Sequence, residues 1–168
     1  MFLDMVEGVN DEFVYEANLT VESEHAISGF RRTRDWAKEQ YLYFYAEFSK
    51  PFNSCALYDK GERVEDTYVE SDNLKACFNF DTEEGEQITM RIALSAVDVE
   101  GAKNNLKAEL AENDFDFDAL KQKAFDKWNT EMKRYAVADP NESNKTVFYS
   151  ALYHCMVAPN LFSDADDL

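Results

Sequence analysis

The residue types that most often carry catalysis or bind transition metals are scarce in this chain. Its 168 residues include two histidines and three cysteines. His154 and Cys155 are neighbours on a predicted helix, where adjacent side chains point about 100° apart and cannot act on each other as base and nucleophile. The sequence therefore argues against a histidine-rich metal site and against a cysteine hydrolase.

His154 has two interpretations. It stands beside the apolar face of its predicted helix, so it either packs within the protein, which the residues favour, or borders a substrate site. Nucleotide chemistry has less support, because the chain has five glycines and contains no GxGxxG or GxxxxGK phosphate-binding string.

Carboxylates are abundant, with 34 Asp and Glu residues against 17 Lys and Arg. A glycosidase needs two carboxylates held several ångströms apart across one sugar ring, which sequence spacing cannot show. Asp164, Asp166 and Asp167 resemble the start of a calcium loop, but the glycine and glutamate that complete such a loop are missing. We therefore predict no metal ligand in this chain.

A cationic and aromatic cluster is formed by Arg31, Arg32, Arg34 and Trp36. Aromatic rings stack on sugar faces and guanidinium groups donate hydrogen bonds to hydroxyls, so the cluster could contact a carbohydrate. In an acidic chain such arginines more often form internal ion pairs, and we favour ion pairs that pin a long loop.

Composition limits the partners. A net charge of −17 repels phosphate backbones and anionic membrane surfaces, so neither nucleic acid nor a membrane is an expected partner. The cysteines share no short spacing, which argues against a disulfide framework. The sequence contains no apolar run of about 20 residues, as a membrane span requires, and no signal peptide at its start.

The residues that could do chemistry lie on two kinds of predicted element. Aromatic and β-branched segments predict strands over 13–21, 40–49, 52–58, 74–80 and 87–97, and Gly85 predicts a hairpin loop between the last two. Two stacked antiparallel sheets are the expected arrangement.

The period then changes to that of helices. Asp98 and Asp116 are predicted caps of two helices that end near residues 113 and 135, and Ser143 opens a third that ends at Pro159. The third helix has a wide apolar face, and we expect its packing partners to lie outside this chain.

Four segments together resemble the glycoside hydrolase family 92 α-mannosidases. They occur in family order, and the most specific strings are FYSALYH and PNLFSD in the last one; the segments cover residues 28–52, 92–110, 115–132 and 145–164. The resemblance implies a β-sandwich followed by α-helices, α+β overall. It divides the chain into an antiparallel two-sheet sandwich (1–97), a helical linker (98–142) and the first helix of an (α/α)6 barrel (143–168).

The resemblance also implies a function. Family members remove terminal α-linked mannose from glycans with inversion, using two carboxylates and a bound calcium ion. Those carboxylates and calcium ligands are expected beyond Leu168, so the chain would be an inactive internal fragment whose partner is the remainder of its own barrel. The parent enzyme would be a bacterial, α-1,2-mannosidase-like protein of the periplasm or the extracellular space.

Four residues are candidates for lying beside the substrate: Trp36, His154, Asn160 and Asp164. Two alternative functions stay open. The chain could be a non-catalytic carbohydrate-binding or scaffolding module, or an acidic protein unrelated to sugars if the resemblance is accidental.

Overall fold

The structure is a computed structural model that describes residues 1–7, 13–35, 37–158 and 162–167. The chain forms two compact units, one of Met1–Phe115 with Ser163–Leu168 and the other of Asp116–Phe162. The domain limits predicted after residues 97 and 142 stay predictions.

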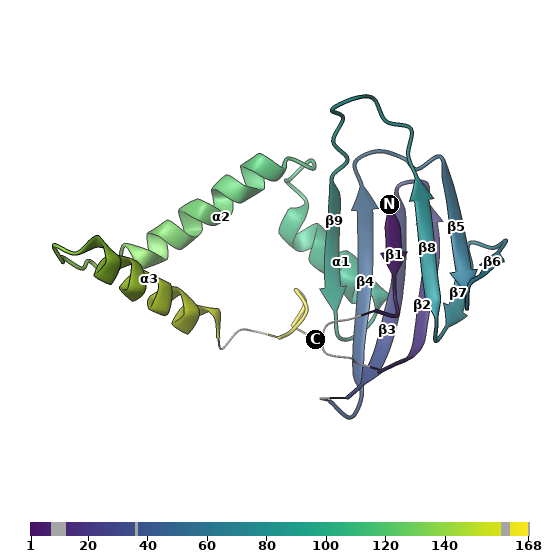
Figure 1. Ribbon diagram of the computed structural model, residues 1–168, viewed down its shortest axis with the longest axis horizontal. Helices are drawn as coiled ribbons and strands as arrows, with labels where there is room; N and C mark the ends of the chain where they lie inside the picture. Colours follow the sequence, from purple (N-terminus) through teal and green to yellow (C-terminus); the bar gives the residue numbers. More distant parts are fainter. Residues whose placement is uncertain (8–12, 36, 159–161, 168) are drawn as a thin grey trace. The chain divides into compact units, whose positions relative to one another are not determined.

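The first unit contains two antiparallel sheets (Figure 1). The five-stranded sheet has the order β7 (Tyr68–Ser71), β2 (Phe13–Ser23), β3 (Ala26–Arg34), β4 (Gln40–Phe48) and β9 (Met90–Ser95). The four-stranded sheet has the order β1 (Phe2–Asp4), β8 (Leu74–Asn79), β5 (Ser54–Asp59) and β6 (Glu62–Val64). The predicted two-sheet arrangement is therefore confirmed.

The core between the sheets is apolar and rich in phenylalanine. Phe48 and Phe78 are almost completely buried, and the Phe48 ring lies 6.1, 5.9 and 5.5 Å from the rings of Phe52, Phe78 and Phe80. These centroid distances are typical of favourable aromatic pairs. Aliphatic residues of both sheets complete the core, among them Leu19, Ile27, Leu57 and Leu74.

Two sequence predictions about this unit are wrong. The segment that contains the arginine cluster is not a long loop, because it forms β3 and pairs with β2 and β4 along its length. The loop around Gly85 does not close a hairpin, because β8 pairs with β1 and β5 whereas β9 pairs with β4 in the other sheet. Gly85 does take the expected positive φ, of 82°.

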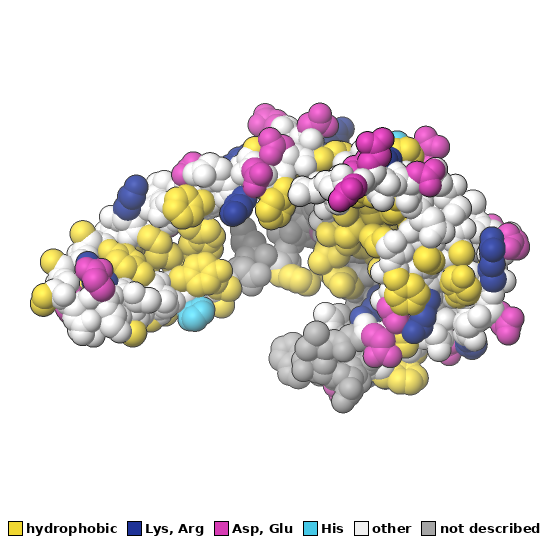
Figure 2. All heavy atoms as spheres, turned by 45° about the horizontal axis from the view of Figure 1, so that its top comes forward, with side chains coloured by type: hydrophobic (Ala, Val, Ile, Leu, Met, Phe, Trp, Pro, Cys, Tyr) yellow, Lys and Arg dark blue, Asp and Glu magenta, His cyan; other side chains and the backbone are white. Residues whose placement is uncertain are grey.

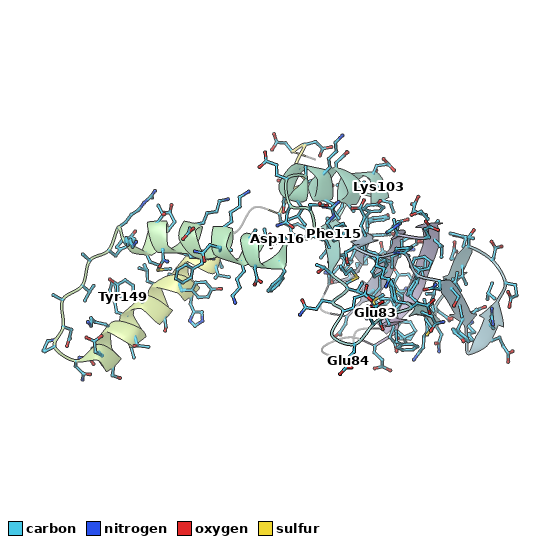
Figure 3. The ribbon with its side chains drawn as sticks, turned by 90° about the horizontal axis from the view of Figure 1, so that it is seen from above. Glu83, Glu84, Lys103, Phe115, Asp116 and Tyr149 are labelled. Atoms are coloured by element: carbon cyan, nitrogen blue, oxygen red, sulfur yellow. The ribbon has the colours of Figure 1, made fainter. Side chains whose placement is uncertain are left out.

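Helix α1 (Val99–Leu110) packs on the outer side of the five-stranded sheet, against β9 and β4. Asp98 caps it as predicted, and its carboxylate accepts a hydrogen bond of 2.7 Å from the Gly101 N–H. Lys103 adds a second link, because its Nζ lies 3.2 Å from Glu22 on β2 and over the ring of Tyr45 on β4 (Figure 3). The helix is therefore part of the sandwich unit.

The second unit is an antiparallel pair of helices, α2 (Phe117–Met132) and α3 (Glu142–Val157) (Figure 1). Asp116 caps α2 as predicted, whereas α3 is capped by Asn141, two residues before the predicted start. Trp128 and Tyr153 join the helices through rings 4.7 Å apart. Tyr149 on α3 donates a hydrogen bond of 2.8 Å to the carbonyl oxygen of Tyr135 (Figure 3).

Most apolar side chains of α2 and α3 are accessible, and neither helix has a buried residue. Val147 is 66% exposed, Phe125 is 60% exposed and Phe148 is 37% exposed. Hydrophobic side chains gather on this pair of helices in Figure 2. Within the helical pair itself, the apolar side chains of α3 are therefore accessible, in line with the wide apolar face that the sequence predicts.

Candidate functional site

The four predicted substrate-adjacent residues fall in different parts of the chain. Asp164 belongs to the sandwich unit and His154 to the helical pair. Trp36 and Asn160 lie outside the described residues. Their predicted place beside a substrate stays a prediction.

Asp164 has the most elaborate surroundings. Its side chain is 7% exposed, and it accepts hydrogen bonds of 2.6 Å from Ser95 Oγ and 2.8 Å from Asn105 Nδ2. The two donors use different carboxylate oxygens. Both oxygens are therefore engaged inside the protein, which is the setting of a structural carboxylate rather than of a free acid or base.

The elements on either side of Asp164 explain why its partners are in place. Ser95 is the last residue of β9, and its Oγ also accepts hydrogen bonds from the Val97 and Asp98 N–H groups. Asn105 lies one helical turn beyond Gly101 on the buried face of α1. Its amide nitrogen also donates to the Leu94 carbonyl, at 2.8 Å, and its amide oxygen accepts from the Ala165 N–H, at 2.6 Å.

Gly101 makes room for the carboxylate. A Cβ atom at this position would lie 2.2 Å from Asp164 Oδ2 and 2.7 Å from Ser95 Oγ. By its helix propensity alone, Gly101 would only weaken the first turn of α1. The structure gives it a packing role, and no local pattern could have identified Ser95 or Asn105 as partners of Asp164.

These contacts also bear on calcium. The DxDD string does not fit a calcium loop, because the oxygens of its first residue, Asp164, already accept hydrogen bonds from Ser95 and Asn105. Among residues 1–7, 13–35, 37–158 and 162–167, no group of three or more His, Cys, Asp or Glu side chains is placed to hold a metal ion.

His154 is an exposed residue of α3 and lines a shallow groove along that helix. Its ring lies 5.7 Å from the ring of Tyr153. The other lining residues are polar or aromatic side chains of the same helix, namely Glu142, Lys145, Thr146, Tyr149 and Ser150. His154 is therefore accessible to solvent in this groove.

Arg32 and Arg34 lie on the outer face of the five-stranded sheet, whereas Arg31, which is paired with the core residue Ala17, lies on its other face. Arg32 makes ion pairs of 2.9 Å with Glu16 and with Glu39, and its guanidinium lies over the rings of Tyr15 and Tyr41, at 4.7 and 4.8 Å. The hydrogen bond to Glu16 raises the pKa of Arg32 further above its usual range. The ion-pair interpretation is therefore confirmed for Arg32, on a strand instead of a loop.

The other two arginines of the cluster, Arg34 and Arg31, have different roles. Arg34 stacks over Tyr15 at 4.3 Å, whereas Arg31 donates to the carbonyl oxygens of Val6 and Glu7. The cluster therefore connects β2, β3, β4 and the segment after β1.

Within the described residues no helix is both long and apolar enough to cross a bilayer.

Comparisons with known proteins agree with this architecture. The sequence profile of the glycosyl hydrolase family 92 N-terminal domain matches residues 1–95, and that of the family 92 catalytic domain matches residues 101–168. A search of curated protein sequences found no match.

Among solved structures, a family GH92 α-mannosidase from Bacteroides thetaiotaomicron is 30% identical, with a TM-score of 0.89 over 98% of this chain and 23% of its own. The same α-mannosidase in complex with mannoimidazole superposes equally well, with a TM-score of 0.89. An inverting family GH92 mannosidase from the same organism is 25% identical, with a TM-score of 0.79 over 95% of this chain and 21% of its own.

The chain thus spans less than a quarter of the length of these solved enzymes. Its sandwich followed by helices confirms the predicted fold class. With matches that cover most of both compact units, this chain belongs to glycoside hydrolase family 92.

Proposed function

We propose that the chain is part of an inverting exo-α-mannosidase that hydrolyses terminal α-mannosides of glycans. The observation that carries the proposal is the 30% identity and the TM-score of 0.89 to an α-mannosidase whose structure is also known with mannoimidazole. The proposed substrate is a mannose-containing glycan, and α-1,2-linked mannose is the first linkage to test.

Inverting hydrolysis requires a general acid and a general base whose carboxyl groups are about 6.5–9.5 Å apart, so that a water molecule fits between the base and the sugar. In the described residues the most buried carboxylate of the chain, Asp164, is committed to Ser95 and Asn105. We propose that both catalytic carboxylates, and the ligands of a calcium ion, belong to other parts of the longer enzyme. The calcium would polarise and orient mannose hydroxyls there.

The test compares the 168-residue chain with the longer polypeptide encoded around it. We expect the longer polypeptide to release mannose from α-1,2-mannobiose and to lose this activity in chelator. Proton NMR of the first product should show β-mannose, as inversion requires. The chain alone should release none. Retention of configuration, or no release from any α-mannoside by the longer polypeptide, would contradict the proposal.

A second candidate is a non-catalytic carbohydrate-binding module. It is favoured by one observation, which is that the sandwich unit has its own buried core. Calorimetric titration with mannobiose separates the two functions. Saturable binding by the folded chain supports the module, and no heat of binding by a folded chain argues against it.

We also propose a bacterial enzyme that works in the periplasm or outside the cell. Support comes from the Bacteroides source of the similar mannosidases. Fractionation of the source cells, followed by immunodetection of the polypeptide, tests this location.

A further inference from the structure

The chain segments before and after the helical pair both contact the same strand of the sandwich, β9. The chain leaves the sandwich unit after Phe115 and re-enters it at Ser163. At the first junction the Arg91 guanidinium lies 4.3 Å from the centre of the Phe115 ring and donates 2.9 Å to the Asn113 carbonyl oxygen. At the second junction Ser95 holds Asp164. Arg91 and Ser95 are both residues of β9.

We propose that Ser95, Asn105 and Asp164 form a latch that fastens the returning segment, residues 163–167, onto α1 and β9. This inference concerns the chain itself and does not depend on the proposed mannosidase activity.

Three features make the latch more than a surface contact. Its partners are far apart in sequence, by 69 residues for Ser95 and 59 for Asn105. It is buried, since Asp164, Ser95 and Asn105 are 7%, 3% and 8% exposed. It also captures the backbone, because the Ala165 N–H donates to Asn105 Oδ1. A buried polar group that loses its hydrogen-bond partners costs more than the hydrogen bond itself contributes, so the seat of Asp164 depends on Ser95 and Asn105.

The geometry selects aspartate at this position. Both donors point at a carboxylate seated directly over Gly101. An asparagine would turn an N–H₂ group toward one of the two donors and lose that hydrogen bond. A glutamate would need room for one more methylene where a Cβ on Gly101 already would not fit.

Hydrogen exchange of the Ala165 amide measures the latch directly, because that N–H is part of it. In Asp164→Ala, the two hydrogen bonds to the Asp164 side chain disappear, so we expect Ala165 to exchange about tenfold faster or more. Amides of β3 and β4 should keep their protection. Asp166→Ala is the matched control, because Asp166 is exposed two residues away. Unchanged exchange at Ala165 in folded Asp164→Ala would overturn the proposal.

Gly101→Ala provides a second variant that keeps the carboxylate. Alanine favours a helix more than glycine does, so a loss of protection cannot come from a weaker α1. We expect faster exchange at Ala165 because the new Cβ displaces Asp164. If Asp164→Ala does not fold, this variant decides the question. Full protection of Ala165 in folded Gly101→Ala would show that the segment is not held over Gly101 and would contradict the latch.

Discussion

The phenylalanine core of the sandwich makes a quantitative prediction about stability. Phe48 is 2% exposed, and three other phenylalanine rings lie within 6.1 Å of its own. Phe48→Ala removes a buried ring and leaves a cavity, which costs about 3–5 kcal/mol in protein cores. Each aromatic pair adds about 0.5–1.5 kcal/mol beyond its buried area, so we expect the upper part of that range.

Urea denaturation followed by far-UV circular dichroism measures this loss. With a slope of about 2 kcal/mol per molar urea, a loss of about 5 kcal/mol lowers the midpoint of the sandwich transition by about 2.5 M. Phe125→Ala is the control, because it makes the same substitution at a side chain that is 60% exposed. It should cost about 1 kcal/mol or less.

The comparison can refute the reasoning. Equal midpoint shifts for Phe48→Ala and Phe125→Ala would mean that the sandwich is not stabilised by the cluster described above. A change in slope without a change in free energy would instead indicate a different compactness of the unfolded chain. Phe48→Leu, which leaves a smaller cavity, should fall between Phe48→Ala and the parent chain.

Three further predictions concern titration, thiol reactivity and metal. The hydrogen bond of 2.6 Å from Ser28 Oγ, with help from Lys103, holds the pKa of Glu22 below its ordinary value of 4.5. Its stabilising effect is therefore present above that value and is lost as the pH falls through the lower folded-state pKa. Ser28→Ala should move the pKa of Glu22 upward in a carbon-13 NMR titration, and an unchanged titration would contradict the assignment. Burial raises the pKa of Cys55 to about 11. Iodoacetamide at neutral pH should therefore label the exposed Cys155 first. Peptide mapping that finds Cys55 labelled equally fast would be inconsistent with this burial. Asp164 is already hydrogen-bonded at both oxygens, so millimolar calcium should leave the melting temperature of the chain unchanged. A clear upward shift of the melting temperature would instead reveal a calcium site that the described residues do not form.

The helical part of the fold was largely predictable because its signals are local. Asp98 and Asp116 cap α1 and α2 as predicted, since a cap depends on a side chain and an N–H about three residues later. Ala102 and Leu106 are four residues apart, which places them on one face of α1, and both are buried. The wide apolar face of α3 was predicted to lack partners here, and its Val147 side chain is indeed exposed.

Sheet membership was less predictable because it depends on residues far apart in the chain. Gly85 has the backbone of a turn residue, yet the strands on either side of it enter different sheets. A turn signal reports local conformation only and does not say which strands pair. Likewise β3 has polar and cationic residues in the second half of its sequence, and only its pairing with β2 and β4 makes it a central strand.

The candidate site shows the same limit. Asp164, which ends the string PNLFSD, was predicted to lie beside a substrate, and the structure places it in a buried cluster with Ser95 and Asn105. Its partners Ser95 and Asn105 carry no local signal, because a serine at the end of a strand and an asparagine on a helix are common. Only the folded chain brings them together.

Strand β9 shows why alternation alone does not reveal which face is covered. Met90, Ile92 and Leu94 alternate with Arg91, Ala93 and Ser95, a pattern that normally turns the apolar set inward. Here the apolar set is 44%, 48% and 50% exposed, while the other face lies under α1. Arg91 donates from there to Glu47 and to the carbonyl oxygens that end α1, and Ser95 donates to Asp164. Buried polar groups are stable only when they are paired. Arg91 has partners in the segment before α2, and Ser95 has a partner in the segment after α3. The polar face of β9 can therefore be the covered one.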